Sequence, residues 1–141
     1  MHKSRTPIWH PLDKLPLFAS LIEGELKSTE EQFLHLNREG REPPVLTDAL
    51  VKRIIRVYIE QQEMIPVLRE QLSRWLKANP TEKQRKELAR TRKNLTRLDK
   101  LTKEILDLAR ELRNFTIEKV LAKDDLNAAL AFLSGKMRQW L

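Results

Sequence analysis

The chain has 141 residues, of which 33% are charged and 40% apolar, and its net charge is +7. This length predicts one domain, and a composition with only three glycines and many Leu, Glu, Lys and Arg residues predicts helices. The absence of cysteine excludes disulfides, zinc–cysteine sites and thiol chemistry. The first residues lack the apolar core of a signal peptide, and no apolar run could span a bilayer, so we expect a cytoplasmic protein without a membrane span.

Residues 1–15 are predicted to form an extended arm, followed by a single helical-bundle domain over residues 16–141. Pro7, Pro11 and Pro16 disfavour helix in the residues that precede them. Trp9 is the side chain that we expect to anchor the arm on one end of the bundle. The alternative is that the arm binds a partner.

The first long helix is expected at about residues 16–38. Its apolar residues recur at steps of three and four, which indicates one buried face: Phe18, Ile22, Leu26, Thr29, Phe33 and Leu36. Gly40 and the pair Pro43-Pro44 then end the helix and form a linker.

The second helix is expected at residues 47–78, with Thr47 or Asp48 as its N-cap. Its predicted inward face consists of Leu50, Ile54, Tyr58, Gln61, Ile65, Leu68, Leu72 and Trp75. Pro66 cannot donate a hydrogen bond to the Gln62 carbonyl, and its ring clashes there, so we expect a kink at this point. Two separate helices are the alternative.

The third helix is expected at residues 79–114, with Asn79 as N-cap, Pro80 in the first turn and Glu82 as the acid of a capping box. A connection this short predicts that the second and third helices are antiparallel neighbours. Its inward positions follow a 3–4 spacing typical of coiled-coil packing: 88, 91, 95, 98, 102, 105, 109 and 112. We expect Asn114 to end it in a left-handed conformation; an unbroken helix to Ala122 is the alternative.

Residues 116–141 are predicted to form a helical tail that packs on the bundle or on a partner. A short helix over residues 116–122 would be capped by Thr116, and a second helix would follow Asp124-Asp125 and end at Gly135. The apolar side chains expected to face inward are Leu126, Leu130 and Leu133.

The predicted fold is therefore all-α: an up-down antiparallel bundle of three long helices with a short helical C-terminal tail. Three wide apolar faces and an apolar tail leave more apolar surface than a monomer would cover. We expect a homodimer or a complex with a protein partner, formed along the second and third helices or through the tail.

No catalytic, cofactor or metal site is predicted. Glu31, His35 and Glu39 share one helix face, but that face is separate from the apolar one, so a solvated surface is favoured over a metal site. No glycine-rich phosphate loop and no nucleophile elbow occurs in the chain. We therefore expect a protein that is not an enzyme.

The positive charge is concentrated in one segment. Nine basic and two acidic residues lie between Lys83 and Lys103, and the remaining basic and acidic residues cancel. The candidate anion- or nucleic-acid-binding face is a line of five residues, called here the basic face: Lys86, Arg90, Lys93, Arg97 and Lys100. It contains no aromatic residue for base stacking and no DNA-binding motif. The leading hypothesis is a non-enzymatic interaction or assembly protein, and the alternative is a nucleic-acid-associated accessory protein that uses the basic face.

Overall fold

The computed structural model describes residues 6–39 and 46–140, with the backbone alone at Glu39, at Phe115 and across residues 134–140. The described residues form four α-helices: α1 (Leu15–Glu39), α2 (Asp48–Leu76), α3 (Glu82–Leu112) and α4 (Ile117–Trp140). Two short 3-10 helices, η1 (Leu12–Lys14) and η2 (Arg113–Phe115), precede α1 and follow α3. No strand occurs in this part of the chain, and the predicted all-α class is confirmed.

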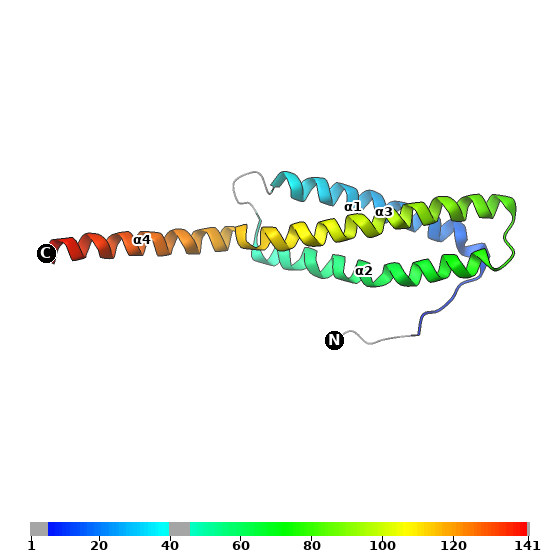
Figure 1. The fold of residues 1–141 in the computed structure, drawn as a ribbon, viewed down its shortest axis with the longest axis horizontal. Helices are drawn as coiled ribbons and strands as arrows, with labels where there is room; N and C mark the ends of the chain where they lie inside the picture. The colour runs from blue at the N-terminus through cyan, green and yellow to red at the C-terminus, as the bar shows by residue number, and fades with distance from the viewer. Residues whose placement is uncertain (1–5, 40–45, 141) are drawn as a thin grey trace.

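Helices α1, α2 and α3 form the predicted up-down antiparallel bundle. Figure 1 shows them running in alternating directions, and α3 packs against both α1 and α2. The backbones of α1 and α2, by contrast, approach each other closely at few of the described residues. The third helix is therefore the centre of the bundle.

The inward face predicted along α3 is confirmed at every position. All eight side chains are buried: Leu88, Thr91, Leu95, Leu98, Thr102, Ile105, Ala109 and Leu112. They belong to a core that has two apolar clusters. One cluster surrounds Trp75 and Leu15, and the other surrounds Ile54 and Leu36 near the opposite end of α3. The 3–4 spacing of α3 thus supplies side chains to both ends of the core.

On α2, the predicted inward position of Leu50 is wrong. Leu50 is 42% exposed, whereas Val51 is buried. Thr47 caps the helix by accepting a hydrogen bond from the Leu50 N–H, which fixes the first turn and directs Val51 into the core. The helix continues unbroken through Pro66, and its path in Figure 1 is curved. The alternative of two separate helices is therefore wrong.

The connection between α2 and α3 is longer than predicted, and Asn79 is not the N-cap. Thr81 caps α3: its Oγ1 accepts from the Gln84 N–H at 3.2 Å, and its own N–H donates to Gln84 Oε1 at 2.8 Å. Asn79 has a φ of 58° instead, a left-handed conformation that asparagine adopts more readily than most residues. The Thr81–Gln84 pair forms a complete capping box, and so the helix starts later than expected.

The end of α3 also differs from the prediction in detail. The helix ends at Leu112 and passes into η2, so Asn114 lies in a 3-10 turn. Asn79 alone has a positive φ among the described non-glycine residues, so Asn114 is not a left-handed terminator. Thr116 is extended, with φ −71° and ψ 160°, and it separates η2 from α4. The alternative of an unbroken helix to Ala122 is wrong.

One polar side chain joins all three bundle helices. Gln61 of α2 donates from Nε2 to Thr102 Oγ1 of α3 at 2.8 Å and to Thr29 Oγ1 of α1 at 3.2 Å. Thr102 in turn donates to the Leu98 carbonyl oxygen at 2.6 Å. Thr29 and Thr102 are buried, and these hydrogen bonds satisfy hydroxyls that would otherwise lose their water contacts.

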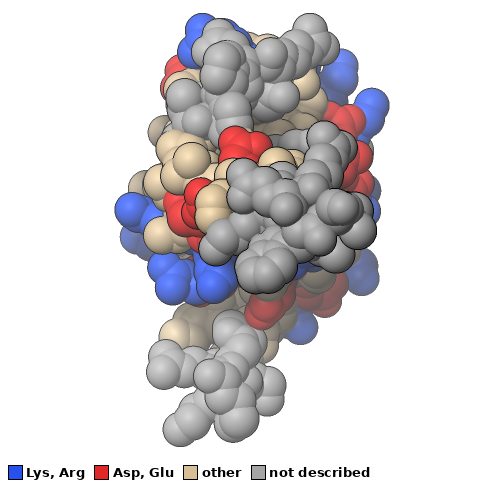
Figure 2. All heavy atoms as spheres, turned by 90° about the vertical axis from the view of Figure 1, so that its left-hand side faces the viewer, with Lys and Arg blue, Asp and Glu red and all other residues tan. Residues whose placement is uncertain are grey.

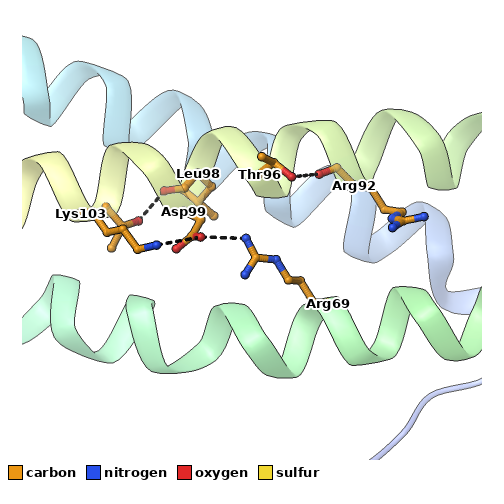
Figure 3. A network of polar contacts seen from close by, with 7 residues as sticks. Arg69, Arg92, Thr96, Leu98, Asp99 and Lys103 are labelled. Carbon is orange, nitrogen blue, oxygen red and sulfur yellow. Dashed lines mark hydrogen bonds and ion pairs between the residues drawn. The ribbon is translucent and has the colours of Figure 1, made fainter.

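An ion-pair network links α2 to α3 at the surface. Figure 3 shows Arg69 of α2 reaching Asp99 of α3, where Lys103 binds the same carboxylate; the two nitrogen–oxygen distances are 2.8 and 3.4 Å. Burial raises the pKa of Asp99, but the hydrogen bonds from Arg69 and Lys103 outweigh it and bring the pKa below its ordinary value. The pair is partly solvated, so its contribution to stability is small.

The N-terminal arm lies over the end of the bundle where α2 ends. Residues 6–11 have no regular secondary structure, and the Arg74 guanidinium lies over the Trp9 ring, 4.2 Å from its centroid. His10 is held through its backbone: its N–H donates to Gln71 Oε1, and its carbonyl accepts from Trp75 Nε1, both at 2.8 Å. The arm is thus held by the His10 backbone as well as by the expected Trp9. Residues 1–5 of the predicted arm lie outside the described residues.

The C-terminal tail differs more from the prediction than any other segment that the structure describes. It is one continuous helix of 24 residues, and the predicted break before Asp124-Asp125 does not occur. Each aspartate inside a helix costs only about 0.7 kcal/mol relative to alanine. A break would instead leave the amides and carbonyls of two extra helix ends without intrahelical partners. Figure 1 shows α4 leading away from the bundle. Leu126, Leu130 and Leu133, predicted to face inward, are exposed.

Candidate functional site

The five residues of the basic face are all exposed on α3. Arg97 forms an ion pair with Glu30 of α1 at 2.7 Å. Within the described residues, the other four form no ion pair. The structure therefore places the five predicted residues along one exposed helix, with one of them paired to α1.

Charges of both signs are interspersed at the end of the molecule where α4 projects. Figure 2 views this end and shows lysine and arginine side chains alternating with aspartate and glutamate along both edges.

The described residues hold no group of three or more His, Asp or Glu side chains placed to bind a metal ion. His35 contacts Arg38, with a Nδ1–Nη2 distance of 3.3 Å, and the side chain of Glu39 lies outside the described residues.

Helix α4 exposes a row of leucines, called here the α4 leucine stripe: Leu126, Leu130 and Leu133. These side chains are 60%, 54% and 54% exposed, and they recur at steps of four and three, so they lie on one face. Every described side chain from Leu121 to Leu133 is exposed. The segment 126–133 contains no charged residue. A helical segment that is apolar and carries no charge is ordinarily buried.

The direction of α4 is set by hydrogen bonds to the start of α2. The Ile117 N–H donates to the Leu46 carbonyl oxygen at 2.8 Å, and the buried Thr116 hydroxyl donates to Asp48 Oδ1 at 2.6 Å. Glu118 Oε2 accepts from the Asp48 N–H at 2.7 Å, and Lys119 lies 3.3 Å from the Asp48 carboxylate. The hydrogen bond from Thr116, assisted by Lys119, lowers the pKa of Asp48 against the opposing effect of burial. We call this set of contacts the α2–α4 junction.

A second uncovered apolar surface lies between α1 and α2, called here the α1–α2 groove. It has a volume of about 460 Å³ and has Leu98 of α3 among its lining residues. Leu21 of α1 and Val57 and Met64 of α2 line it and are 58%, 43% and 53% exposed. Glu25 and Glu60 also line it.

Comparison with protein-family models, with curated proteins and with solved structures finds no significant match to this chain. Among the described helices, none combines the length and the apolar character needed to cross a membrane.

The α1–α2 groove was not predicted from the sequence, although one signal for it exists. Leu50, Val57 and Met64 recur at seven-residue steps on α2, next to the inward face. Such a spacing marks a second apolar stripe beside the first. A prediction of one buried face per helix does not include this second stripe. Whether the stripe is buried or exposed depends on where α1 lies.

Proposed function

We propose that this chain is a non-enzymatic assembly protein that binds another protein chain through α4. The observation that carries the proposal is the exposure of the α4 leucine stripe on a helix that leaves its own bundle. Burying one leucine fully is favourable by roughly 1.5–3 kcal/mol, so three leucines on one face supply a large part of the affinity of a micromolar complex.

The α2–α4 junction supports this role, because it presents α4 in one direction. Hydrogen bonds from Thr116 and Ile117 hold the first turn of α4 to the start of α2. A docking helix that is already oriented loses less conformational freedom on binding than a free tail.

The proposal predicts that removing the leucine stripe separates the complex without unfolding the bundle. We expect the wild-type chain to be larger than a monomer in light scattering at about micromolar concentration, and the variant L126S/L130S/L133S to be monomeric. The matched control is L17S/L34S, because these two leucines are similarly exposed on α1 outside the α1–α2 groove. Both variants should keep the helical melting transition of the bundle.

A wild-type chain that stays monomeric at tens of micromolar, and that captures the same proteins from lysate as the triple serine variant, would contradict the proposal. Capture should be compared with and without nuclease, so that contacts bridged by nucleic acid are not counted as protein contacts.

Nucleic-acid binding through the basic face is the second candidate. The observation in its favour is that Lys86, Arg90, Lys93 and Lys100 are exposed and, within the described residues, form no ion pair. Under this function, DNA or RNA binding at about 50 mM salt should be salt-sensitive and should be abolished by R90E/K93E/R97E. The control R53E/R56E/K77E places the same charge change on α2 and on the residue that follows it, and it should retain binding. Absence of binding by the wild-type chain would remove this candidate.

A further inference from the structure

The α1–α2 groove has the geometry of a helix bundle from which one helix is missing. Helices α1 and α2 each pack on α3, but their backbones come close to each other at few of the described residues. A fourth helix opposite α3 would contact both of them, as in a four-helix bundle. The exposed side chains of Leu21, Val57 and Met64 face this space.

The chain carries a helix of suitable chemistry, but its own α4 does not reach the groove. Figure 1 shows α4 leaving the bundle at the end where α2 begins and extending away from it. The charge-free segment 126–133, with its exposed leucine stripe, matches the apolar lining of the groove. The groove of one copy and the α4 of another are therefore complementary surfaces.

A twofold-symmetric dimer can bring the α4 of each copy to the α1–α2 groove of the other copy. The start of α4 and the start of α2 lie side by side, because the Ile117 N–H donates to the Leu46 carbonyl oxygen at 2.8 Å. A twofold axis close to this junction reverses the direction of the second copy. The α4 of the second copy then runs along the first bundle, parallel to α2, and the first copy makes the same contact in return.

The positions of the apolar residues agree with this arrangement. Leu126 and Leu133 lie nine and sixteen residues after the first residue of α4. Val57 and Met64 lie nine and sixteen residues after the first residue of α2. At about 1.5 Å per residue, Leu126 and Val57 both lie about 14 Å from the junction, and Leu133 and Met64 both lie about 24 Å from it.

The area of such an interface is sufficient for a stable dimer. Helix α4 has 24 residues, which correspond to a length of about 36 Å and a width of about 10 Å. Docked along its whole length, one helix would cover roughly 360 Å² of the surface of α1 and α2, the groove included, and two reciprocal contacts would bury roughly 1,400 Å² counted on both surfaces. This exceeds the roughly 1,000 Å² expected of a specific interface.

We propose that α4 of each copy docks in the α1–α2 groove of a second copy, parallel to α2, with Leu126 level with Val57 and Leu133 level with Met64. This inference rests on the proposed function and names its partner as an identical chain. The resulting dimer is an exchange of fourth helices between two three-helix bundles.

Cysteine cross-linking tests the register, because the chain has no cysteine of its own. One protein carries Val57→Cys, and a second, with a tag that changes its mass, carries Leu126→Cys. Under mild oxidation, the mixture should give a covalent heterodimer at the sum of the two masses, since opposed β-carbons permit a disulfide. Met64→Cys mixed with Leu133→Cys should give the same result.

The matched control replaces the neighbouring residue, Arg56→Cys, mixed with Leu126→Cys. Arg56 is exposed at almost the same level of α2 but does not line the groove, so this mixture should stay non-covalent. Equal cross-linking of Arg56→Cys and Val57→Cys would overturn the docking, and so would efficient cross-linking of Leu126→Cys with itself alone. Light scattering on the wild-type chain separates the two proposals: a dimer without the Val57–Leu126 cross-link leaves the assembly function standing and rejects the groove as the site.

Discussion

Replacing Trp75 by alanine is expected to lower the free energy of unfolding by about 3–5 kcal/mol. Trp75 is buried in the cluster that contains Leu15, and its ring packs edge-to-face on Phe18 with a centroid distance of 5.1 Å. Its Nε1 also donates to the His10 carbonyl oxygen, so the substitution removes one of the contacts that hold the N-terminal arm. Urea denaturation followed by circular dichroism measures the loss.

Trp75→Phe separates the two contributions. The phenyl ring retains most of the apolar contact but loses the hydrogen bond to His10, so a loss of about 0.5–1.5 kcal/mol is expected from that bond, with a further small loss from the smaller ring. Leu76→Ala is the control, because this neighbouring side chain is exposed and should change stability by less than about 1 kcal/mol. A Trp75→Ala loss no larger than that of Leu76→Ala would contradict the assigned core.

Replacing Ile105 by alanine is expected to lower the free energy of unfolding by about 2–5 kcal/mol. Ile105 is fully buried in the second core cluster, with Ile54 and Leu36. The cavity left behind would be enclosed by helices on more than one side, so the surrounding side chains can fill it only in part. The same denaturation experiment measures the loss.

Leu101 supplies the control for α3. It lies one turn before Ile105 but is only partly buried, so Leu101→Ala should have the smaller effect. Because Trp75 and Ile105 belong to different clusters that α3 connects, both substitutions should shift a single cooperative transition. Two separate transitions in either variant would show that the clusters unfold independently.

The inward face of α3 could be predicted from the sequence because its apolar residues and two threonines keep one phase over eight positions. Burial inside the bundle then follows from helix geometry alone. The first residue of each helix was harder to predict, since neighbouring polar residues compete for the cap. Asn79 with Glu82 and Thr81 with Gln84 both have the spacing of a capping box, and the structure forms the second of the two.

The surfaces of the candidate site could be predicted only in part. The apolar character of Leu126, Leu130 and Leu133 is visible in the sequence, but the sequence left open whether the tail packs on its own bundle or on a partner. Hydrogen bonds at Thr116 direct α4 the other way, and those depend on residues that are distant in sequence. The α1–α2 groove likewise depends on how far apart two helices lie on a third, which no local pattern specifies.

The hydrogen bond between Thr116 and Asp48 joins residues that are 68 positions apart in the sequence. The two residues meet because the start of α2 and the end of α3 lie side by side in the antiparallel pair. The direction of α4 therefore depends on that packing: a change that separates this end of α2 from α3 would also remove the hydrogen bonds that orient the leucine stripe.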